Sequence, residues 1–405
     1  MISILNLRSM SASPSVPILD LSRHHQFIQA ELEAVFQRVL TSGQFILGPE
    51  VAAFEKECAE YLGAKHALGV SSGTDALLLA MMALGIGPGD EVIVPSYTFF
   101  ATAGCVSRLG AIPIFTDSSL CCFNISVAKI EKKITRKTKA IMPVHLFGQS
   151  ADLDPIQELA KKHGLFLIED AAQAIGAKYK GRSVGTFGEF GCFSFFPTKN
   201  LGALGDAGLI TTNDDALAAE ARLLRNHGDS GTYLHEKVGA NFRIDALQAA
   251  LLRVKLRHLD CATAGRQRNA GLYLEKFLQS GQASFPVEAC VCSAEKFISP
   301  SGPAPILLPF ACQPDHVYNQ FVLLFTQEGV RDRVLSHLHS QNIGARVYYP
   351  LPLHAQACFA SLPSRTGDFP FCNYASTHSL ALPIFPELRE EEIELVARQV
   401  LLALK

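Results

Sequence analysis

Short apolar runs alternate with longer segments of helical periodicity between residues 67 and 168, and this alternation limits the fold more than any other feature of the chain. The runs expected as strands cover residues 67–70, 91–94, 112–115, 140–144 and 165–168, and the helices between them residues 74–84, 98–109 and 153–163. Neighbouring strands joined by a helix run parallel, and a parallel sheet is buried on both faces. The sequence therefore predicts an α/β fold with a mostly parallel sheet covered by helices.

The chain of 405 residues is too long for one hydrophobic core, so we expect two domains. A helical stretch from Asp245 to about Gln279 leaves the first domain, and residues 280–315, rich in Pro, Ser and Cys, are expected to be a linker or insertion. The following segments predict a small α+β domain that ends in a helix at 389–404. We predict an N-terminal arm (1–16), a large domain (17–257) and a small C-terminal domain (258–405).

The composition argues against several classes of partner. The formal net charge is only −2, which gives no strong attraction to nucleic acid or to a membrane surface. No run of 18 apolar residues predicts a membrane span, and the first 14 residues lack the basic start and long apolar core of a signal peptide. The 11 cysteines include no C-x-x-C pair, so we expect reduced thiols in a cytoplasmic protein rather than a zinc site or a disulfide framework.

Asp170 and Lys199 are the candidate catalytic residues. Asp170 follows the predicted strand at 165–168, at the end of the strand where open α/β sheets bind ligands, and Lys199 follows a second apolar run at 190–196. A pyridoxal 5′-phosphate enzyme needs a lysine that holds the aldehyde as a Schiff base and an acid that keeps the pyridine nitrogen protonated. Alone, Asp170 could be a helix cap and Lys199 a surface charge, so the prediction depends on the motifs around them.

A phosphate site is predicted where a strand turns into a helix at Gly73. Glycine permits a tight turn, and the N–H groups of the first helical turn, together with the Thr74 hydroxyl, would face an anion. Ser194, five residues before Lys199, could donate a further hydrogen bond. The same Ser-Gly-Thr sequence is also a common helix cap, and the absence of a following lysine argues against a nucleoside triphosphate loop.

Three more side chains are candidates for contacts with the cofactor. Phe99 follows a strand end and could stack on a flat heteroaromatic ring, although a core position is the simpler interpretation. Gln173, three residues after Asp170, could reach a ring hydroxyl. Asn241 precedes a long helix, where it is either a polar contact or an N-cap.

These residues belong to a series of motifs that resembles the DegT/DnrJ/EryC1/StrS family of pyridoxal-phosphate sugar aminotransferases. The motifs occur in order at residues 43–50, 72–77, 95–99, 169–173, 193–195 with Lys199, 225–228, 239–243 and 348–354. The resemblance extends over about residues 17 to 400. Because so many motifs occur in order, it is highly specific.

The resemblance implies a pyridoxal-phosphate-dependent transferase fold of type I, similar to aspartate aminotransferase, and a homodimer with active sites at the subunit interface. It implies that Lys199 is the Schiff-base lysine and Asp170 the partner of the pyridine nitrogen. It further implies that Phe99 stacks on the cofactor ring and that Gln173 contacts the ring hydroxyl.

The resemblance implies that the phosphate is bound by Gly73, Thr74 and Ser194, and by Asn241 of the neighbouring subunit. The residues implied to contact the substrate are Tyr349, His354 and Arg243.

The resemblance also implies a ping-pong transamination through the Lys199 internal aldimine, with L-glutamate as the expected amino donor. The pyridoxamine 5′-phosphate form would then aminate a nucleotide-linked keto sugar for polysaccharide or secondary-metabolite synthesis. The sugar stays open between C3 and C4 ketones and between dTDP and UDP carriers, with Gln173 and residues 349–354 favouring a 3-keto sugar. Three alternatives remain. A pyridoxal-phosphate-binding regulator or sensor predicts a broken cofactor site, and in a sugar dehydratase His replaces the lysine. Another chemistry of the same fold type, such as decarboxylation or desulfuration, would share Asp170 and Lys199 but not the sugar-pocket motifs.

Overall fold

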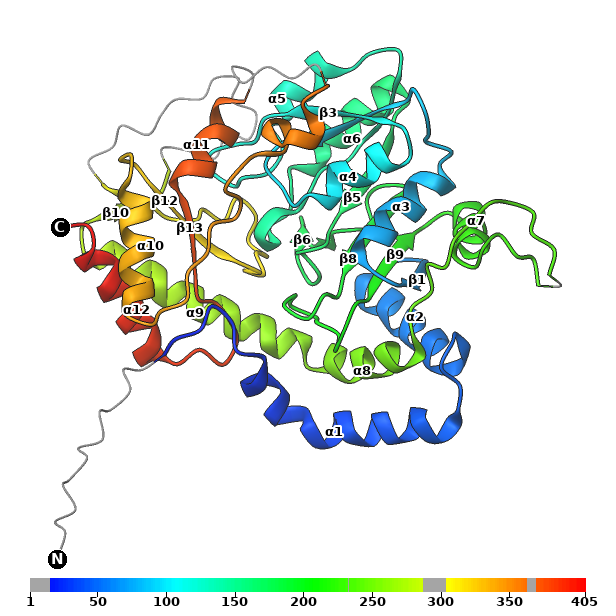
Figure 1. Cartoon of the computed structure of the whole chain (residues 1–405), viewed down its shortest axis with the longest axis horizontal. Coiled ribbons are helices and arrows are strands. Elements are labelled where there is room, and N and C mark those ends of the chain that lie inside the picture. Colours follow the sequence, from blue (N-terminus) through cyan, green and yellow to red (C-terminus); the bar gives the residue numbers. More distant parts are fainter. Residues whose placement is uncertain (1–14, 232, 287–303, 363–368) are drawn as a thin grey trace, which may run out of the picture.

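The computed structural model describes residues 15–231, 233–286, 304–362 and 369–405 (Figure 1). A seven-stranded sheet forms the centre of the larger part, in the order β1-β9-β8-β5-β4-β2-β3. Its strands are β1 (His66–Val70), β2 (Glu91–Pro95), β3 (Ile112–Thr116), β4 (Thr138–Ile141), β5 (Phe166–Asp170), β8 (Phe190–Ser194) and β9 (Gly208–Thr212). Only β9 is antiparallel to its neighbours in this sheet, so the prediction of a mostly parallel sheet is confirmed.

Both faces of this sheet are apolar, because successive side chains of a strand point to opposite sides. On β5, Ile168 packs into one core and Leu167 into another. Helices α3, α4 and α7 cover the first face, and α2, α6 and α8 cover the second. Their bounds are α2 (Gly48–Leu62), α3 (Gly73–Ala83), α4 (Ala101–Arg108), α6 (Leu153–His163), α7 (Asp215–Arg225) and α8 (Ala246–Arg257).

The first helix, α1 (Leu21–Ser42), runs along the outside of α8 (Figure 1). It begins at Asp20, whose carboxylate accepts a hydrogen bond from the Ser22 N–H at 3.0 Å. One face of α1 buries its aliphatic side chains against Leu251 and Val254 of α8. Away from this face, the Phe27 side chain is 81% exposed, so α1 carries apolar surface that the described residues do not cover.

The helical stretch expected from 245 to 279 is two helices, which differs from the prediction of one. It breaks at His258 into α8 and α9 (Leu259–Gln279), and α9 carries the chain into the smaller part (Figure 1). There, a four-stranded sheet in the order β10-β11-β12-β13 shares a core with α9, α10 and α12. The elements are β10 (Ala283–Ser284), β11 (Ile306–Leu307), β12 (Phe321–Phe325), β13 (Ser379–Leu382), α10 (Val330–Ser340), α11 (Pro370–His378) and α12 (Glu390–Leu402).

The N-terminal segment contributes to this smaller core. Val16 is fully buried there, and its carbonyl accepts a hydrogen bond from the Gly344 N–H at 2.7 Å. Residues 1–14 of the expected arm lie outside the described residues, as do residues 287–303 of the expected linker. Val16, at the end of the expected arm, is therefore part of a packed core.

Among the described cysteines, Cys312 departs from the expectation of reduced thiols. Cys312 is disulfide-bonded. Cys58, Cys105, Cys192 and Cys372 are buried free thiols, and Cys261 and Cys358 are exposed ones. Among the described helices, none is both long enough and apolar enough to cross a lipid bilayer.

Candidate active site

The predicted cofactor residues meet along one edge of the large sheet. Gly73 follows β1, Phe99 follows β2, Asp170 ends β5 and Ser194 ends β8. These four strands run in the same direction, so their carboxyl ends lie on the same edge. The parallel topology alone thus gathers residues that are far apart in the sequence.

Asp170 is fixed in a buried position at the centre of this edge. Only 4% of its surface is exposed. One carboxylate oxygen accepts the Thr102 hydroxyl at 2.8 Å, and the other accepts the Ala172 N–H at 3.2 Å. Burial raises the pKa of Asp170, while the hydrogen bonds and the Lys199 charge lower it. A buried acid held in this way is suited to a cationic partner such as a protonated pyridine nitrogen.

Lys199 lies in the tight loop after β8. Its N–H bonds the Phe196 carbonyl at 2.8 Å, and the Ala203 N–H bonds the Phe195 carbonyl at 2.7 Å, so the loop folds back on itself. Burial lowers the pKa of Lys199 to about 8, and the negative charge of Asp170 opposes that shift. The structure therefore brings the two predicted catalytic groups into one site and provides an amine that is partly neutral near physiological pH.

Gly73 and Ser194 make a close contact where a phosphate group was predicted. A Cβ atom on Gly73 would lie 2.6 Å from the Ser194 Cβ, which leaves no room for a side chain. The Ser72 hydroxyl caps α3 by accepting the Asp75 N–H at 3.0 Å. The first N–H groups of α3, at Gly73 and the exposed Thr74, have no acceptor within the helix. Backbone donors and a hydroxyl are thus available where the phosphate site is predicted.

Gln173 is oriented by two hydrogen bonds. Its side-chain oxygen accepts the Phe147 N–H at 2.6 Å, and its side-chain nitrogen donates to the Tyr349 hydroxyl at 3.3 Å. Because a backbone N–H can only donate, the first bond fixes which end of the amide is which. The structure thus joins Gln173 to Tyr349, two residues that were predicted separately for the cofactor and for the substrate.

The segment at 348–354 is tied to the end of β2. The Tyr97 hydroxyl accepts the Tyr349 N–H at 2.8 Å. The Ser96 hydroxyl lies 2.6 Å from Nδ1 of His354, whose ring stacks on Phe369 at 4.1 Å between centroids. His354 is therefore buried where the motif at 348–354 contacts the motif at 95–99, and 6% of its surface is exposed.

Three other predicted residues lie farther from this network. Phe99 is 59% exposed, and Asn241 is exposed in the stretch before α8. Arg243 is partly buried, and its guanidinium donates to the Asn226 side-chain oxygen at 2.5 Å. Among the described residues, these three side chains make no hydrogen bond or ion pair with Asp170 or Lys199.

Thr102 and Tyr97 were not assigned a role from the sequence. Thr102 supports Asp170 directly, and Tyr97 fastens the segment that carries Tyr349. Tyr97 lies in the motif that carries Phe99, and Thr102 follows Phe99 by three residues in the helix predicted at 98–109. That spacing puts the two side chains on one face of the helix and is a signal that could have found Thr102.

The residues of this site fit pyridoxal phosphate. Asp170 is a buried acid beside an amine of lowered pKa, as a pyridine nitrogen and an aldehyde require. The first N–H groups of α3, which begins at Gly73, have no acceptor within the helix and could bind a phosphate. The sheet edge thus offers groups that match each end of the cofactor.

Comparison with known proteins agrees with this site. A model of the DegT/DnrJ/EryC1/StrS aminotransferase family matches residues 26–401. A pleiotropic regulatory protein of Geobacillus stearothermophilus is 44% identical over 95% of this chain and 98% of its own. A UDP-N-acetyl-3-dehydro-alpha-D-glucosamine 3-aminotransferase of Acidithiobacillus ferrooxidans is 42% identical over 96% of this chain and 98% of its own. The crystal structure of S. venezuelae DesV with a ketimine intermediate has a TM-score of 0.87 at 40% identity, covering 97% of this chain and 99% of that one.

The fold and the paired lysine and acid define a pyridoxal-phosphate-dependent aminotransferase of fold type I. The chain belongs to the DegT/DnrJ/EryC1/StrS aminotransferase family. The predicted family, fold class and cofactor are therefore confirmed, while the roles of the individual residues stay predictions.

Proposed function

We propose that this protein transfers an amino group from an amino acid to a nucleotide-linked keto sugar, with L-glutamate as the proposed donor. The observation that carries the proposal is the pairing of Lys199 with buried Asp170 beside the Gly73–Ser194 contact. The substrate names of the aminotransferase relatives support the sugar as acceptor. A cytoplasmic location and a place in polysaccharide biosynthesis belong to the same proposal.

Each protein group has a separate task in this proposal. Bound pyridoxal phosphate supplies an aldehyde and an electron-accepting ring. Lys199 would hold the aldehyde, and its amine would move a proton to and from the substrate carbon, because its lowered pKa makes the amine a usable base. Asp170 would keep a proton on the ring nitrogen, and Thr102 holds the carboxylate in place. The backbone at Gly73 and the Ser194 hydroxyl would hold the phosphate.

For the acceptor, we propose a sugar with its ketone at C3. Gln173 and Tyr349 are hydrogen-bonded to each other next to the predicted ring position, and the family member of A. ferrooxidans is named for a 3-amino product. We assign Tyr349, His354 and Arg243 to the sugar-nucleotide side of the site. Because His354 is buried and bonded to Ser96, it would position the 348–354 segment and make little direct contact with the sugar.

A second subunit is also part of the proposal. Phe45, Ile46 and Phe99 are 47%, 55% and 59% exposed, which is unusual for large apolar side chains near a functional site. The exposed Asn241 side chain makes no hydrogen bond with any described residue, which supports a reach into a neighbouring site. We therefore propose a homodimer that completes two active sites at its interface.

The test is a pair of half-reactions on the purified holoenzyme. Addition of L-glutamate should bleach the visible absorbance of bound pyridoxal phosphate, and addition of a nucleotide-linked 3-keto sugar should restore it. The 4-keto sugar with the same nucleotide is the matched control. Bleaching without recovery by any keto sugar of the panel would contradict the proposed acceptor.

A regulatory function is the second candidate, because the relative of G. stearothermophilus is named a pleiotropic regulatory protein. That function needs bound cofactor but no turnover. Stable absorbance in the presence of every amino donor tested would favour the regulator, whereas bleaching by glutamate favours the enzyme. A dehydratase is disfavoured because Lys199 occupies the position where such relatives carry His.

A further inference from the structure

Asp117 is a buried acid at the edge of the large sheet that carries the candidate active site. It follows β3, which runs parallel to β2, so it lies on the same edge as the residues that follow β2. Only 1% of its surface is exposed. A buried carboxylate needs partners that compensate its charge, so its contacts indicate what it does in the fold.

The Asp117 carboxylate has three partners, and two of them belong to a distant helix. One oxygen accepts the Cys372 N–H at 2.9 Å, and the other accepts the Phe371 N–H at 3.3 Å. The second oxygen also lies 2.6 Å from Nζ of Lys129, in α5 (Val127–Ile130). Phe371 and Cys372 are the second and third residues of α11, 254 and 255 residues after the acid in the sequence.

This contact supplies a cap that α11 lacks in its own sequence. The first N–H groups of a helix have no acceptor within it, and the side chain of the preceding residue commonly accepts one of them. The residue before α11 is Phe369, whose side chain makes no capping hydrogen bond, and the helix begins at Pro370, which has no N–H. The negative charge of Asp117 is also favourable at the N-terminal end of the helix dipole. The larger part of the chain therefore caps a helix that leads into the smaller part.

The capped helix lies against the segment that carries the predicted substrate residues. The Phe371 ring meets the Tyr97 ring edge-on, with 6.4 Å between centroids. The Tyr97 hydroxyl lies 2.8 Å from Oγ of Ser379, the residue directly after α11, and accepts the Tyr349 N–H at 2.8 Å. One end of α11 thus rests on the acid, and both ends contact the tyrosine that holds the 348–354 segment.

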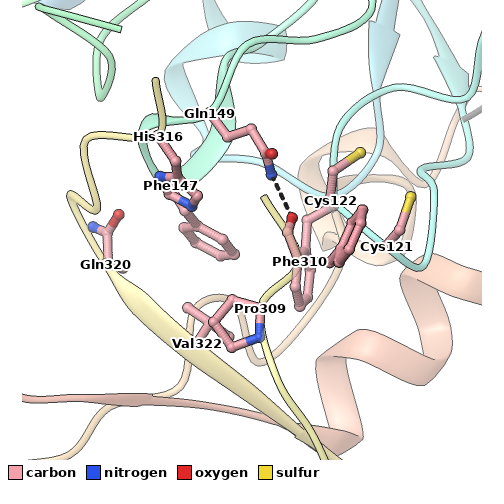
Figure 2. A pocket seen from close by; sticks show the side chains of 10 residues that line it. Cys121, Cys122, Phe147, Gln149, Pro309, Phe310, His316, Gln320 and Val322 are labelled. Carbon is pink, nitrogen blue, oxygen red and sulfur yellow. Dashed lines mark hydrogen bonds between the residues drawn. The ribbon is translucent and has the colours of Figure 1, made fainter. Parts of the chain in front are cut away.

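The loop that follows Asp117 has supports of its own. The Asn124 side chain donates to the Gln149 carbonyl at 3.0 Å. Figure 2 shows Cys122 of this loop near Phe310, whose carbonyl accepts the side-chain nitrogen of Gln149 at 3.2 Å. These bonds do not involve α11, so the loop presents the carboxylate from a position that is set independently of the helix.

We propose that Asp117 is a positioning residue for the acceptor substrate: by capping α11, it fixes the 348–354 segment at the active-site edge. The identity of the acceptor rests on the proposed function, whereas the cap does not. Without the carboxylate, two N–H groups of α11 and the Lys129 ammonium lose their partner, and the first turn of the helix frays. Asp170 and Lys199 lie on and after other strands, β5 and β8, and keep their places.

The test compares Asp117→Ala with Asp214→Ala in the full-length holoenzyme. Asp214 is the matched control, because its carboxylate caps α7 by accepting the Ala216 N–H at 2.7 Å, and α7 packs on α3 and β1. Asp117→Ala should raise the KM for the nucleotide-linked keto sugar by about 10-fold, the effect of losing one good cap. The rate at which L-glutamate bleaches the cofactor should stay within about 2-fold of the wild type, since this half-reaction does not use the acceptor. Asp214→Ala should change neither.

Amide hydrogen exchange of the same proteins, read by peptide mass spectrometry, tests the cap without any substrate. Asp117→Ala should speed exchange about 10-fold in residues 371–378 and 348–354, and Asp214→Ala should not. Asp117→Asn keeps one acceptor oxygen and should show a smaller change in the same peptides, which decides the matter if the alanine variant does not fold.

Unchanged exchange in residues 348–354 would overturn the proposal, as would a parallel loss of both half-reactions. If the wild type accepts no keto sugar, the proposed function loses its acceptor. The exchange measurement then decides the role of Asp117 separately.

Discussion

The two sides of the proposed active site differ in how much of their structure one chain supplies. On the Asp170 side, the acid, Thr102 and Gln173 are buried or nearly so and are hydrogen-bonded within the chain. On the other side, Phe99 and Asn241 are exposed. The comparison indicates that the chain alone fixes the acid and the groups bonded to it, whereas the side with Phe99 and Asn241 stays exposed in one chain and, in our proposal, is completed by a second subunit.

The largest effect is expected from Lys199→Ala on the fixed side. Without the amine, the cofactor has no covalent attachment and the substrate carbon has no base, so transamination should fall by at least about 10⁴-fold. Turnover and the visible spectrum of the purified variant measure this. Lys178→Ala, at an exposed lysine of β6 (Lys178–Tyr179), is the control and should stay active. Normal turnover by the Lys199 variant would refute the assignment.

Asp170→Asn should reduce turnover by about 10²- to 10³-fold, because an amide does not stabilise a charged ring nitrogen. It should also change a pH profile. Asp170 raises the pKa of Lys199, which burial lowers to about 8. The neutral amine captures the aldehyde, so the rate at which apoprotein takes up pyridoxal phosphate should rise with pH through about 8. In the variant that rise should move to lower pH; an unmoved profile would show that the two groups are not coupled.

Gly73→Ala tests the phosphate end. The new Cβ would lie 2.6 Å from the Ser194 Cβ. Overpacking of this kind costs about 1–3 kcal/mol, and if the whole cost weakens cofactor binding, the affinity falls roughly 10- to 100-fold. Equilibrium titration of apoprotein with pyridoxal phosphate measures it. Gly271→Ala, within α9 and with open space around its Cβ, is the control and should be neutral or slightly stabilising. Equal affinity in both variants would argue against a phosphate at Gly73.

Thr102→Val removes the hydroxyl that donates to Asp170. The buried carboxylate loses a partner, which costs about 1–3 kcal/mol and raises the pKa of Asp170. We expect about 10-fold weaker cofactor binding and an acid limb of activity shifted to higher pH, since the acid must be ionised. Thr102→Ser keeps the hydroxyl and should restore both properties. A purely packing role for Thr102 would leave the pH profile in place.

The smallest effect on folding is expected from Phe99→Ala on the open side. Because the ring is 59% exposed, the free energy of unfolding should change by less than about 0.5 kcal/mol, while loss of ring stacking should weaken cofactor binding by about 0.5–1.5 kcal/mol. Phe193→Ala, at a fully buried ring of β8, should instead cost about 3–5 kcal/mol of stability. Denaturant titration of both variants measures the free energy of unfolding and compares the exposed ring with the buried one. A large loss of stability in the Phe99 variant would contradict the view that this ring lies on an open side of the site.

The sequence predicted the fixed side of the site better than the open side. Strand periodicity placed Asp170 at a strand end, and parallel topology then brought it to Lys199. Two hydrogen bonds could not be predicted: the Thr102 hydroxyl donates to Asp170, and the Phe147 N–H donates to the Gln173 side chain. They depend on how side chains are oriented across the sheet, and residue spacing in the sequence does not give that orientation. The break at His258 was missed because both α8 and α9 lack strong helix-breaking residues there.

The most direct test of the central claim is chemical trapping of the cofactor. Holoenzyme treated with borohydride should carry one phosphopyridoxyl group per chain, located by peptide mass spectrometry on Lys199, and prior conversion with L-glutamate should prevent the labelling. Label on a different lysine, or no label on a protein that still transaminates, would contradict the account.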